Sequence, residues 1–308
     1  MAYQLVLDTD IGTDVDDALA LAFALRHPGI ELVAVTTVSG DPVKRAHIAA
    51  KLLELAGRDD IEVAAGLGDR ALPEGRSAWM GHEGQGLLEP HEEVAISPRD
   101  GVDVLVALTG GEHRCNVATV GMQTNLAAAL ERDDSLAGRV PCVAVMGGLF
   151  APIVTGDRTI GPEGDHNLRI DPVSSVRSLN AGMPLIYVPL DVTSQTYLTR
   201  AQVDRLREGD PLCRALASLV DVWAPIMHRF TEGRMPPDHV AVMHDPLTVA
   251  ALVGGDFITL EDLPVTAVAH EGEVRTFVDP VAGRPAQVVT SVDAVAFGDL
   301  WLETVLAG

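Results

Sequence analysis

The sequence has 308 residues, 47% hydrophobic and 4% aromatic, which is enough apolar material for a large core. Its formal net charge of −22 argues against nucleic acid and anionic membrane surfaces as partners, because phosphates would be repelled. The three widely spaced cysteines form no metal-binding motif, and no targeting segment or membrane-spanning apolar stretch is visible, so we expect a cytoplasmic protein.

Strands and helices alternate through the first half of the chain. Strands are expected at residues 5–7, 30–38, 61–65, 116–120 and 140–146, and the continuous apolar run 5–7 is typical of a strand buried on both faces. The helices expected between them cover residues 18–25, 43–56, 102–107 and a segment ending at 132. The glycine-rich segment 66–97 has no clear periodicity, and its length predicts a functional loop or lid.

The second half of the chain is less regular. Helices are expected near residue 173, at 200–207, 211–230 and 247–253, and from 293. Strands are expected at 185–188, 266–270, 274–278 and 287–290. The alternation predicts an α/β fold with an open, mostly parallel central sheet flanked by helices, and a small extra β segment near the C-terminus. No repeat or linker divides the chain, so we expect one domain over residues 1–308.

Acidic residues follow the first strand in unusual density. Within ten residues the chain carries Asp8, Asp10, Asp14, Asp16 and Asp17. A helix N-terminus stabilises one or two carboxylates but not five, because the remaining charges repel one another. A hard cation such as calcium or magnesium suits a set of ligands that offers only oxygen. The alternative is a solvated acidic turn with one helix cap, which the apolar flanking segments disfavour.

Two known acidic motifs were compared with this loop. An EF-hand fails, because Thr13 and Leu19 stand where that motif needs Gly and Glu. The opening strand with Asp8-Thr9-Asp10 fits haloacid dehalogenase-type phosphohydrolases, which would make Asp8 the nucleophile of a magnesium-dependent enzyme. That reaction needs a well-placed lysine, but the only lysines, Lys44 and Lys51, share one early helix.

Seven segments carry a resemblance over nearly the whole chain. They are residues 7–21 (LDTDIGTDVDDALAL), 33–41 (VAVTTVSGD), 81–88 (GHEGQGLL), 123–130 (QTNLAAAL), 144–148 (AVMGG), 165–172 (DHNLRIDP) and 242–247 (VMHDPL). In this order and spacing they resemble the inosine-uridine-preferring nucleoside hydrolase family. The resemblance implies one bound calcium ion and hydrolysis of the N-glycosidic bond of a ribonucleoside, or a related N-riboside, to free base and ribose.

The resemblance also implies a role for each matching residue. Asp10 matches the aspartate that binds the metal and acts as general base on the attacking water, and His244 matches an imidazole near the leaving base. The implied calcium ligands are Asp10, Asp17, Asp245 and the main-chain carbonyl of Thr124. The implied substrate contacts are Asp16, Asp41, His82, Met146, Asp165 and Asn167. Asp8 is expected to be a supporting acid, and a homodimer or homotetramer is expected because relatives often form one.

The chain also departs from the commonest form of the family. Its first motif has two additional residues, and Asp14 has no counterpart there. Asp41 and Asp165 stand where many members have Asn and Glu, and an Asn expected for the 5′ end of the sugar is missing from residues 161–164. The substrate therefore stays open, and a modified nucleoside is one alternative. Another is a catalytically silent nucleoside or sugar sensor, which an Asp10→Ala change would distinguish from an enzyme by its effect on turnover.

Trp79, Trp223 and His228 are candidates for stacking on a base. His166 and His270 are expected to be structural.

Overall fold

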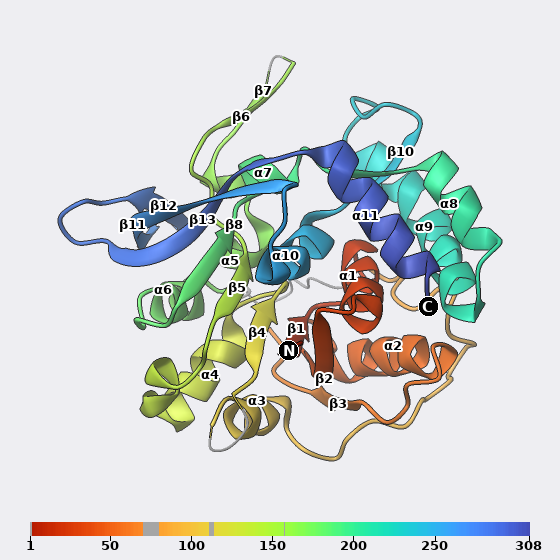
Figure 1. The fold of residues 1–308 in the computed structure, drawn as a ribbon, viewed down its shortest axis with the longest axis horizontal. Coiled ribbons are helices and arrows are strands. Elements are labelled where there is room, and N and C mark those ends of the chain that lie inside the picture. Colours follow the sequence, from red (N-terminus) through yellow and green to blue (C-terminus); the bar gives the residue numbers. More distant parts are fainter. Residues whose placement is uncertain (1, 70–79, 111–113, 157) are drawn as a thin grey trace.

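The computed structural model describes residues 2–69, 80–110, 114–156 and 158–308. A central sheet lies between two layers of helices (Figure 1). The strands are β1 (Tyr3–Thr9), β2 (Ile30–Thr37), β3 (Glu62–Ala65), β4 (Asn116–Thr119), β5 (Val143–Met146), β6 (Ile153–Thr155), β7 (Arg158–Ile160), β8 (Leu185–Val188), β9 (Tyr197–Thr199), β10 (His239–Val242), β11 (Ile258–His270), β12 (Glu273–Val278) and β13 (Arg284–Val292).

The α-helices are α1 (Asp16–Arg26), α2 (Pro42–Leu55), α3 (Gly101–Thr109), α4 (Thr124–Arg132), α5 (His166–Ile170), α6 (Pro172–Leu179), α7 (Leu190–Thr193), α8 (Arg200–Arg207), α9 (Pro211–Phe230), α10 (His244–Val253) and α11 (Ala294–Leu306). Two short 3-10 helices cover Asp134–Gly138 and Pro162–Gly164.

The central sheet has nine strands in the order β12-β11-β13-β8-β5-β4-β1-β2-β3. Every pair from β13 to β3 is parallel, whereas β11 is antiparallel to both β12 and β13. The predicted fold class is therefore confirmed, including the extra β segment near the C-terminus. The sheet joins the first and last strands of the chain, as a single domain would; that domain count stays a prediction.

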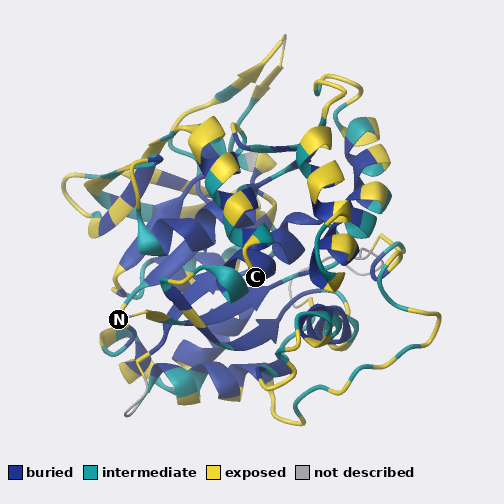
Figure 2. Cartoon of the chain, turned by 45° about the vertical axis from the view of Figure 1, so that its right-hand side comes forward, coloured by how far each residue is buried: buried dark blue, intermediate teal, exposed yellow. Residues whose placement is uncertain are grey.

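Two apolar cores lie on opposite faces of the sheet (Figure 2). Successive residues of β1 alternate between them, because side chains along a strand point to opposite faces. Leu5 and Leu7 pack with α1, α9, α10 and α11, whereas Val6 packs with α3, α4 and α6. Burial on both faces explains why β1 is a continuous apolar run.

Several elements were not predicted from the sequence. Strand β11 begins at Ile258 rather than 266, and α5, α7 and the strand pairs β6–β7 and β9–β10 were missed. The missed elements are short, and the first residues of β11 are largely exposed. These segments therefore lack the regular spacing of apolar residues from which a strand or helix is predicted. Strand β11 instead gains its length by pairing with β13 from Ile258 to Val265.

The glycine-rich segment is irregular where the structure describes it. Residues 66–69 and 80–97 contain no helix or strand, apart from the isolated bridge between Ala64 and Ser97. Residues 70–79, including the predicted base-stacking candidate Trp79, lie outside the described residues.

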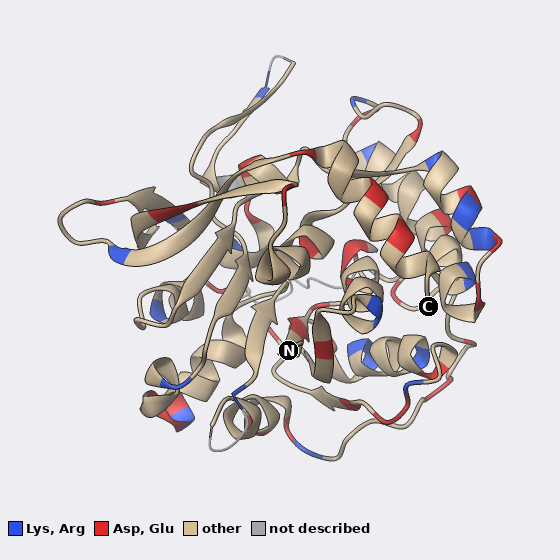
Figure 3. Ribbon diagram, viewed as in Figure 1, with Lys and Arg blue, Asp and Glu red and all other residues tan. Residues whose placement is uncertain are grey.

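Among the described helices, none combines the length and apolar character needed to cross a membrane. Acidic and basic residues are found mainly on the outer helices and loops, with acids in excess (Figure 3).

The parallel strands bring distant segments to one edge of the sheet. Strands β1, β4 and β5 are parallel neighbours, so the residues that follow them meet at their carboxyl ends. Asp10, Val120 and Met146 lie at these ends and line the same cavity. Ligand sites of open α/β sheets lie at this edge.

Candidate active site

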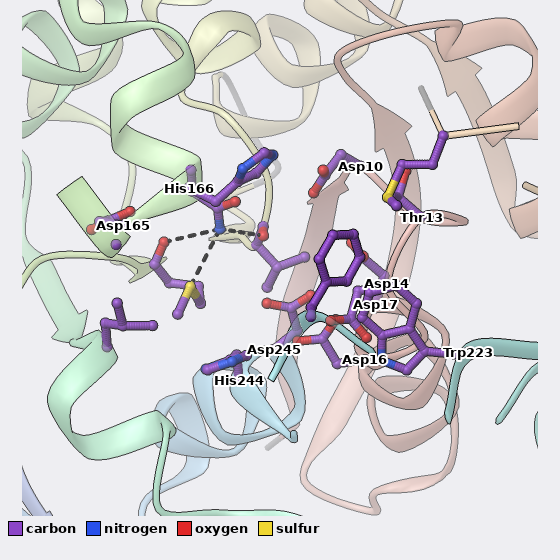
Figure 4. Close-up of a pocket in the computed structure, with 17 residues that line it drawn as sticks. Asp10, Thr13, Asp14, Asp16, Asp17, Asp165, His166, Trp223, His244 and Asp245 are labelled. Atoms are coloured by element: carbon purple, nitrogen blue, oxygen red, sulfur yellow. Dashed lines mark hydrogen bonds between the residues drawn. The ribbon is translucent and has the colours of Figure 1, made fainter. Parts of the chain in front are cut away.

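A cavity of about 420 Å³ opens at the carboxyl ends of the central strands (Figure 4). Its walls combine carboxylates on one side with apolar, aromatic and amide groups around them. The lining residues are Asp10, Thr13, Asp14, Asp16, Asp17, Met80, Val120, Met146, Gly164, Asp165, His166, Asn167, Leu190, Trp223, Phe230, His244 and Asp245.

Three buried carboxylates form the densest charge in this cavity. Asp16, Asp17 and Asp245 each offer an oxygen, and these oxygens all lie within 4.8 Å of one another. Asp16 and Asp17 begin α1, and Asp245 lies in the first turn of α10, so two helix N-termini converge on the cluster. Their positive ends offset only part of three negative charges. The cluster could therefore hold a metal ion, and its oxygen-only donors suit a hard cation.

The pKa values of these three carboxyl groups also indicate that their negative charges are not fully compensated. Burial, followed by the charges of neighbouring carboxylates, raises the pKa of Asp16, Asp17 and Asp245 well above the ordinary value. Asp10 is among the charged neighbours of all three. Without a cation, the site therefore favours protons on these carboxyl groups.

Asp10 reaches the cavity on a tightly held main chain. The Arg45 guanidinium donates to its carbonyl oxygen, and to that of Ile11 at 2.9 Å. A Cβ at Gly121 would lie 2.8 Å from Oδ1 of Asp10, so this position needs glycine for the close approach of the two segments. Asp10 was predicted from the sequence, whereas Arg45 and Gly121 were not, because neither residue resembles a site residue until the loops are folded together.

Asp14, left open by the sequence, lines the cavity. Its carboxylate accepts the main-chain N–H of Val15 at 2.6 Å, and burial raises its pKa to about 8. The longer first motif therefore brings a further acid to the site instead of a turn that points away from it.

The opposite wall is hydrogen-bonded internally. Asp165 accepts the main-chain N–H groups of Gly148 at 2.6 Å and Leu168 at 3.0 Å, and burial raises its pKa to about 6. The amide nitrogen of Asn167 donates to the Val120 carbonyl at 2.7 Å and also contacts Met146 at 3.3 Å. These bonds fix the side chains of a wall that faces the acidic cluster (Figure 4).

His244 lies beside the cluster, one residue before Asp245. Its Nδ1 shares a hydrogen bond of 2.7 Å with the Thr193 hydroxyl, and burial lowers its pKa to about 4. The imidazole is therefore neutral near pH 7, with its orientation fixed by Thr193.

Three predicted site residues are not among those that line this cavity. Thr124 begins α4 and its hydroxyl donates to Asp171 at 2.9 Å, so the ligand role of its carbonyl stays a prediction. Asp41 is exposed and caps α2 by accepting the N–H of Lys44 at 3.0 Å. His82 bonds the Thr13 carbonyl at 2.7 Å and stacks against Trp223. Substrate contacts by Asp41 and His82 likewise stay predictions.

Asp8 lies beneath the site. It is fully buried, and its Oδ1 accepts hydrogen bonds from Thr36 at 2.7 Å and Asn125 at 2.8 Å. Burial raises its pKa to about 7. The phosphohydrolase interpretation, which needs Asp8 as an accessible nucleophile, is therefore wrong.

Aromatic side chains from α9 complete the cavity. Trp223 and Phe230 line it, with ring centroids 6.4 Å apart. Trp223 was a stacking candidate. Phe230 was missed, because an apolar residue at helical spacing is equally typical of the buried face of a helix. His166, expected to be structural, also lines the cavity. His228 and His270 do not belong to the described lining.

The fold and the cavity define an α/β protein with an acidic site at the carboxyl ends of its parallel strands. The chain matches the family model "Inosine-uridine preferring nucleoside hydrolase" over residues 5–299. This chain belongs to that family, and it is a hydrolase acting on N-glycosyl compounds.

Relatives named as ribonucleoside hydrolases match over almost their full length. The pyrimidine-specific ribonucleoside hydrolase RihA of Salmonella gallinarum is 30% identical, with 98% of each chain covered. Among solved structures, the plant nucleoside hydrolase PpNRh1 has a TM-score of 0.85 at 25% identity, with both chains fully covered. The purine-preferring ribonucleoside hydrolase from Gardnerella vaginalis has a TM-score of 0.81 at 23% identity, covering 99% of this chain and 98% of that one, which supports the fold.

Proposed function

We propose that this enzyme hydrolyses the N-glycosidic bond of a ribonucleoside, or a related N-riboside, to free base and ribose. Asp10 is the general base toward the attacking water, and calcium is the metal. One observation carries the proposal: Asp10 lines the same cavity as the Asp16, Asp17 and Asp245 cluster. A base, a cation site and an enclosed space for a small ligand therefore occur together.

The donor set favours calcium. Asp16, Asp17 and Asp245 supply carboxylate oxygen, the ligand type that calcium prefers, and calcium accepts about 6–8 such donors. Asp16 belongs to this cluster, so we propose it as a further ligand beside Asp10, Asp17, Asp245 and the Thr124 carbonyl. The sugar contact predicted for Asp16 from the sequence stays a prediction. When bound, calcium would supply positive charge that orients water and the adjacent hydroxyls of ribose.

Asp10 has the position that a general base needs. Arg45 and Gly121 fix its main chain, which holds the residue at the cavity wall. Proton transfer from water to this carboxylate generates the nucleophile. The surrounding carboxylates then stabilise the positive charge that develops on the sugar as the base departs.

The opposite wall is suited to the sugar. Asn167 uses its amide nitrogen within the protein, which leaves its carbonyl oxygen as the acceptor for a hydroxyl. Met146 provides an apolar surface beside it. The two oxygens of Asp165 already accept main-chain N–H groups, so Asp165 shapes this wall and offers the sugar only weaker, shared hydrogen bonding.

His244 and the aromatic residues are suited to the base. A neutral imidazole beside the cluster can form a hydrogen bond with the leaving base, but its lowered pKa makes it a poor source of a full proton near pH 7. Trp223 and Phe230 offer faces for stacking. The relatives are named for pyrimidine and for purine substrates, so both classes belong in the test.

The test measures ribose release from a panel of purine and pyrimidine ribonucleosides, with calcium, with a chelator, and after calcium is restored. We expect turnover on at least one nucleoside that chelation abolishes and calcium restores. Asp10→Asn keeps the shape of the side chain but removes its basicity, so kcat should fall by at least about 100-fold. Asp262→Asn makes the same change at an exposed residue of β11 and should leave kcat unchanged.

Calorimetry of calcium and nucleoside binding separates the remaining outcomes. Calcium and nucleoside binding without any ribose release would establish the sensor and contradict the hydrolase proposal. Turnover that survives complete removal of metal would contradict the calcium assignment alone.

We also propose a cytoplasmic homodimer or homotetramer, and light scattering after gel filtration tests the oligomer.

A further inference from the structure

Two buried charges flank a hydroxyl beside the cavity. Arg45 is 0% exposed and Glu83 is 7% exposed. Nη2 of Arg45 donates to the Thr13 hydroxyl at 3.1 Å, and that hydroxyl donates to Oε1 of Glu83 at 3.2 Å. Buried charges are costly without hydrogen-bond partners, and hydrogen bonds to charged groups are among the stronger ones. Thr13 therefore links a guanidinium and a carboxylate that each need neutralising contacts.

Each end of this connection holds main chain. Arg45 donates to the carbonyls of Asp10, Ile11 and Ser39, and so fixes the loops after β1 and β2. The two oxygens of Glu83 accept the N–H groups of Met80 and Gly81, each at 2.6 Å. The connection thus joins the acidic loop to the segment that begins at Met80.

That segment forms part of the substrate cavity. Met80 lines the cavity together with Thr13 itself. His82 bonds the Thr13 carbonyl at 2.7 Å and stacks on Trp223 with ring centroids 6.0 Å apart, and Trp223 is another lining residue. The position of this wall relative to Asp10 therefore depends on contacts made by Thr13.

We propose that Thr13 is a positioning residue for substrate binding: its hydroxyl connects Arg45 to Glu83 and so fixes Met80, which lines the cavity, and the neighbouring Gly81. The inference rests on the proposed function, because it assigns this wall to the nucleoside. It also gives a role to the longer first motif, in which Thr13 lies. Arg45 holds Asp10 directly, so loss of the Thr13 hydroxyl should affect substrate affinity more than the chemical step.

The test compares Thr13→Val with Thr13→Ser. Valine keeps the β-branched shape without the hydroxyl, whereas serine keeps the hydroxyl. In the calcium-loaded protein, Thr13→Val should speed hydrogen exchange at the Met80 and Gly81 amides by about tenfold and raise KM by about tenfold, with kcat within about twofold. Thr13→Ser should stay close to wild type in each measurement.

Thr109→Val is the matched control. Thr109 is fully buried, and its hydroxyl donates to the Leu105 carbonyl at 2.7 Å at the end of α3. This change should lower Tm without altering exchange at Met80 and Gly81, or KM. If Thr13→Val fails to fold, Glu83→Gln replaces it, because glutamine keeps the size but has one acceptor oxygen for two N–H groups.

Unchanged exchange at Met80 and Gly81 in Thr13→Val would overturn the connection. Faster exchange with unchanged KM, or serine behaving like valine, would overturn the positioning role. Hydrogen exchange needs no substrate, so a wild-type enzyme that cleaves no nucleoside would contradict the proposed function while the connection itself is still tested.

Discussion

Buried carboxylates lie on opposite sides of the cavity, with Asp165 on one side and a cluster of three on the other, and the two sides differ in their partners. Asp165 accepts two main-chain N–H groups, which satisfy one oxygen each. Asp16, Asp17 and Asp245 instead face one another with oxygens within 4.8 Å. The first arrangement stabilises the chain by itself, whereas the second is unfavourable while the three groups are ionised with no cation between them. The same residue type thus builds structure at one wall and a candidate cation site at the other.

The largest effect is expected when one carboxylate is removed from the cluster. Asp245→Asn should weaken calcium binding by at least about 100-fold and abolish turnover, because a ligand is lost. The same change should raise Tm in chelator by about 2 °C, because it relieves repulsion among buried charges. Calorimetry and thermal unfolding with Asp262→Asn as control measure both effects. A lower Tm in chelator would contradict this account of the cluster.

The next expected effect is a reversal of pH dependence by calcium. Burial raises the pKa of Asp8 to about 7 and of Asp14 to about 8, and the pKa values of the cluster are raised as well. Without calcium, the folded chain therefore binds more protons than the unfolded chain, and its stability should fall as pH rises from about 4 to about 8. With calcium, which binds ionised carboxylates, Tm should rise over that range.

Thermal unfolding from about pH 4 to about pH 8, with calcium or with chelator, measures this reversal. Parallel Tm profiles in the two conditions would show that the cluster binds no cation.

A smaller effect is expected at the opposite wall. Asp165→Asn keeps only one acceptor oxygen for two main-chain N–H groups, so we expect a loss of about 1–3 kcal/mol in the free energy of unfolding. Calcium affinity should stay within about twofold of wild type, because Asp165 lies outside the cluster of Asp16, Asp17 and Asp245. Urea unfolding and calorimetry distinguish this result from that of Asp245→Asn. A large loss of calcium affinity would show that the two walls are not independent.

The smallest effect is expected at Asp41, which is exposed and outside the described cavity lining. Asp41→Ala removes the N-cap of α2 and should cost about 1 kcal/mol, whereas Asp41→Asn keeps a good cap and should be neutral. We expect both variants to keep the KM of wild type. An increase in KM with unchanged stability would instead establish the sugar contact predicted from the sequence.

The sequence determined the sheet and its ligand edge. Continuous apolar runs such as 5–7 and 185–188 predict strands buried on both faces, and the helices between them require parallel crossovers. The dense acids after the first strand predicted a cation site, because local sequence places them on one loop. The resemblance added Asp245, which no local pattern connects to Asp16 and Asp17.

Which side chains meet in the folded protein depends on long-range packing. Arg45 and Glu83 look like ordinary surface charges in the sequence, and their burial on either side of Thr13 depends on how three loops pack. Asp41 and Asp165 both matched sugar-binding positions, yet both bond to the main chain. Hydrogen-bond partners far along the chain set the role of each carboxylate, and residue type and spacing alone do not contain that information.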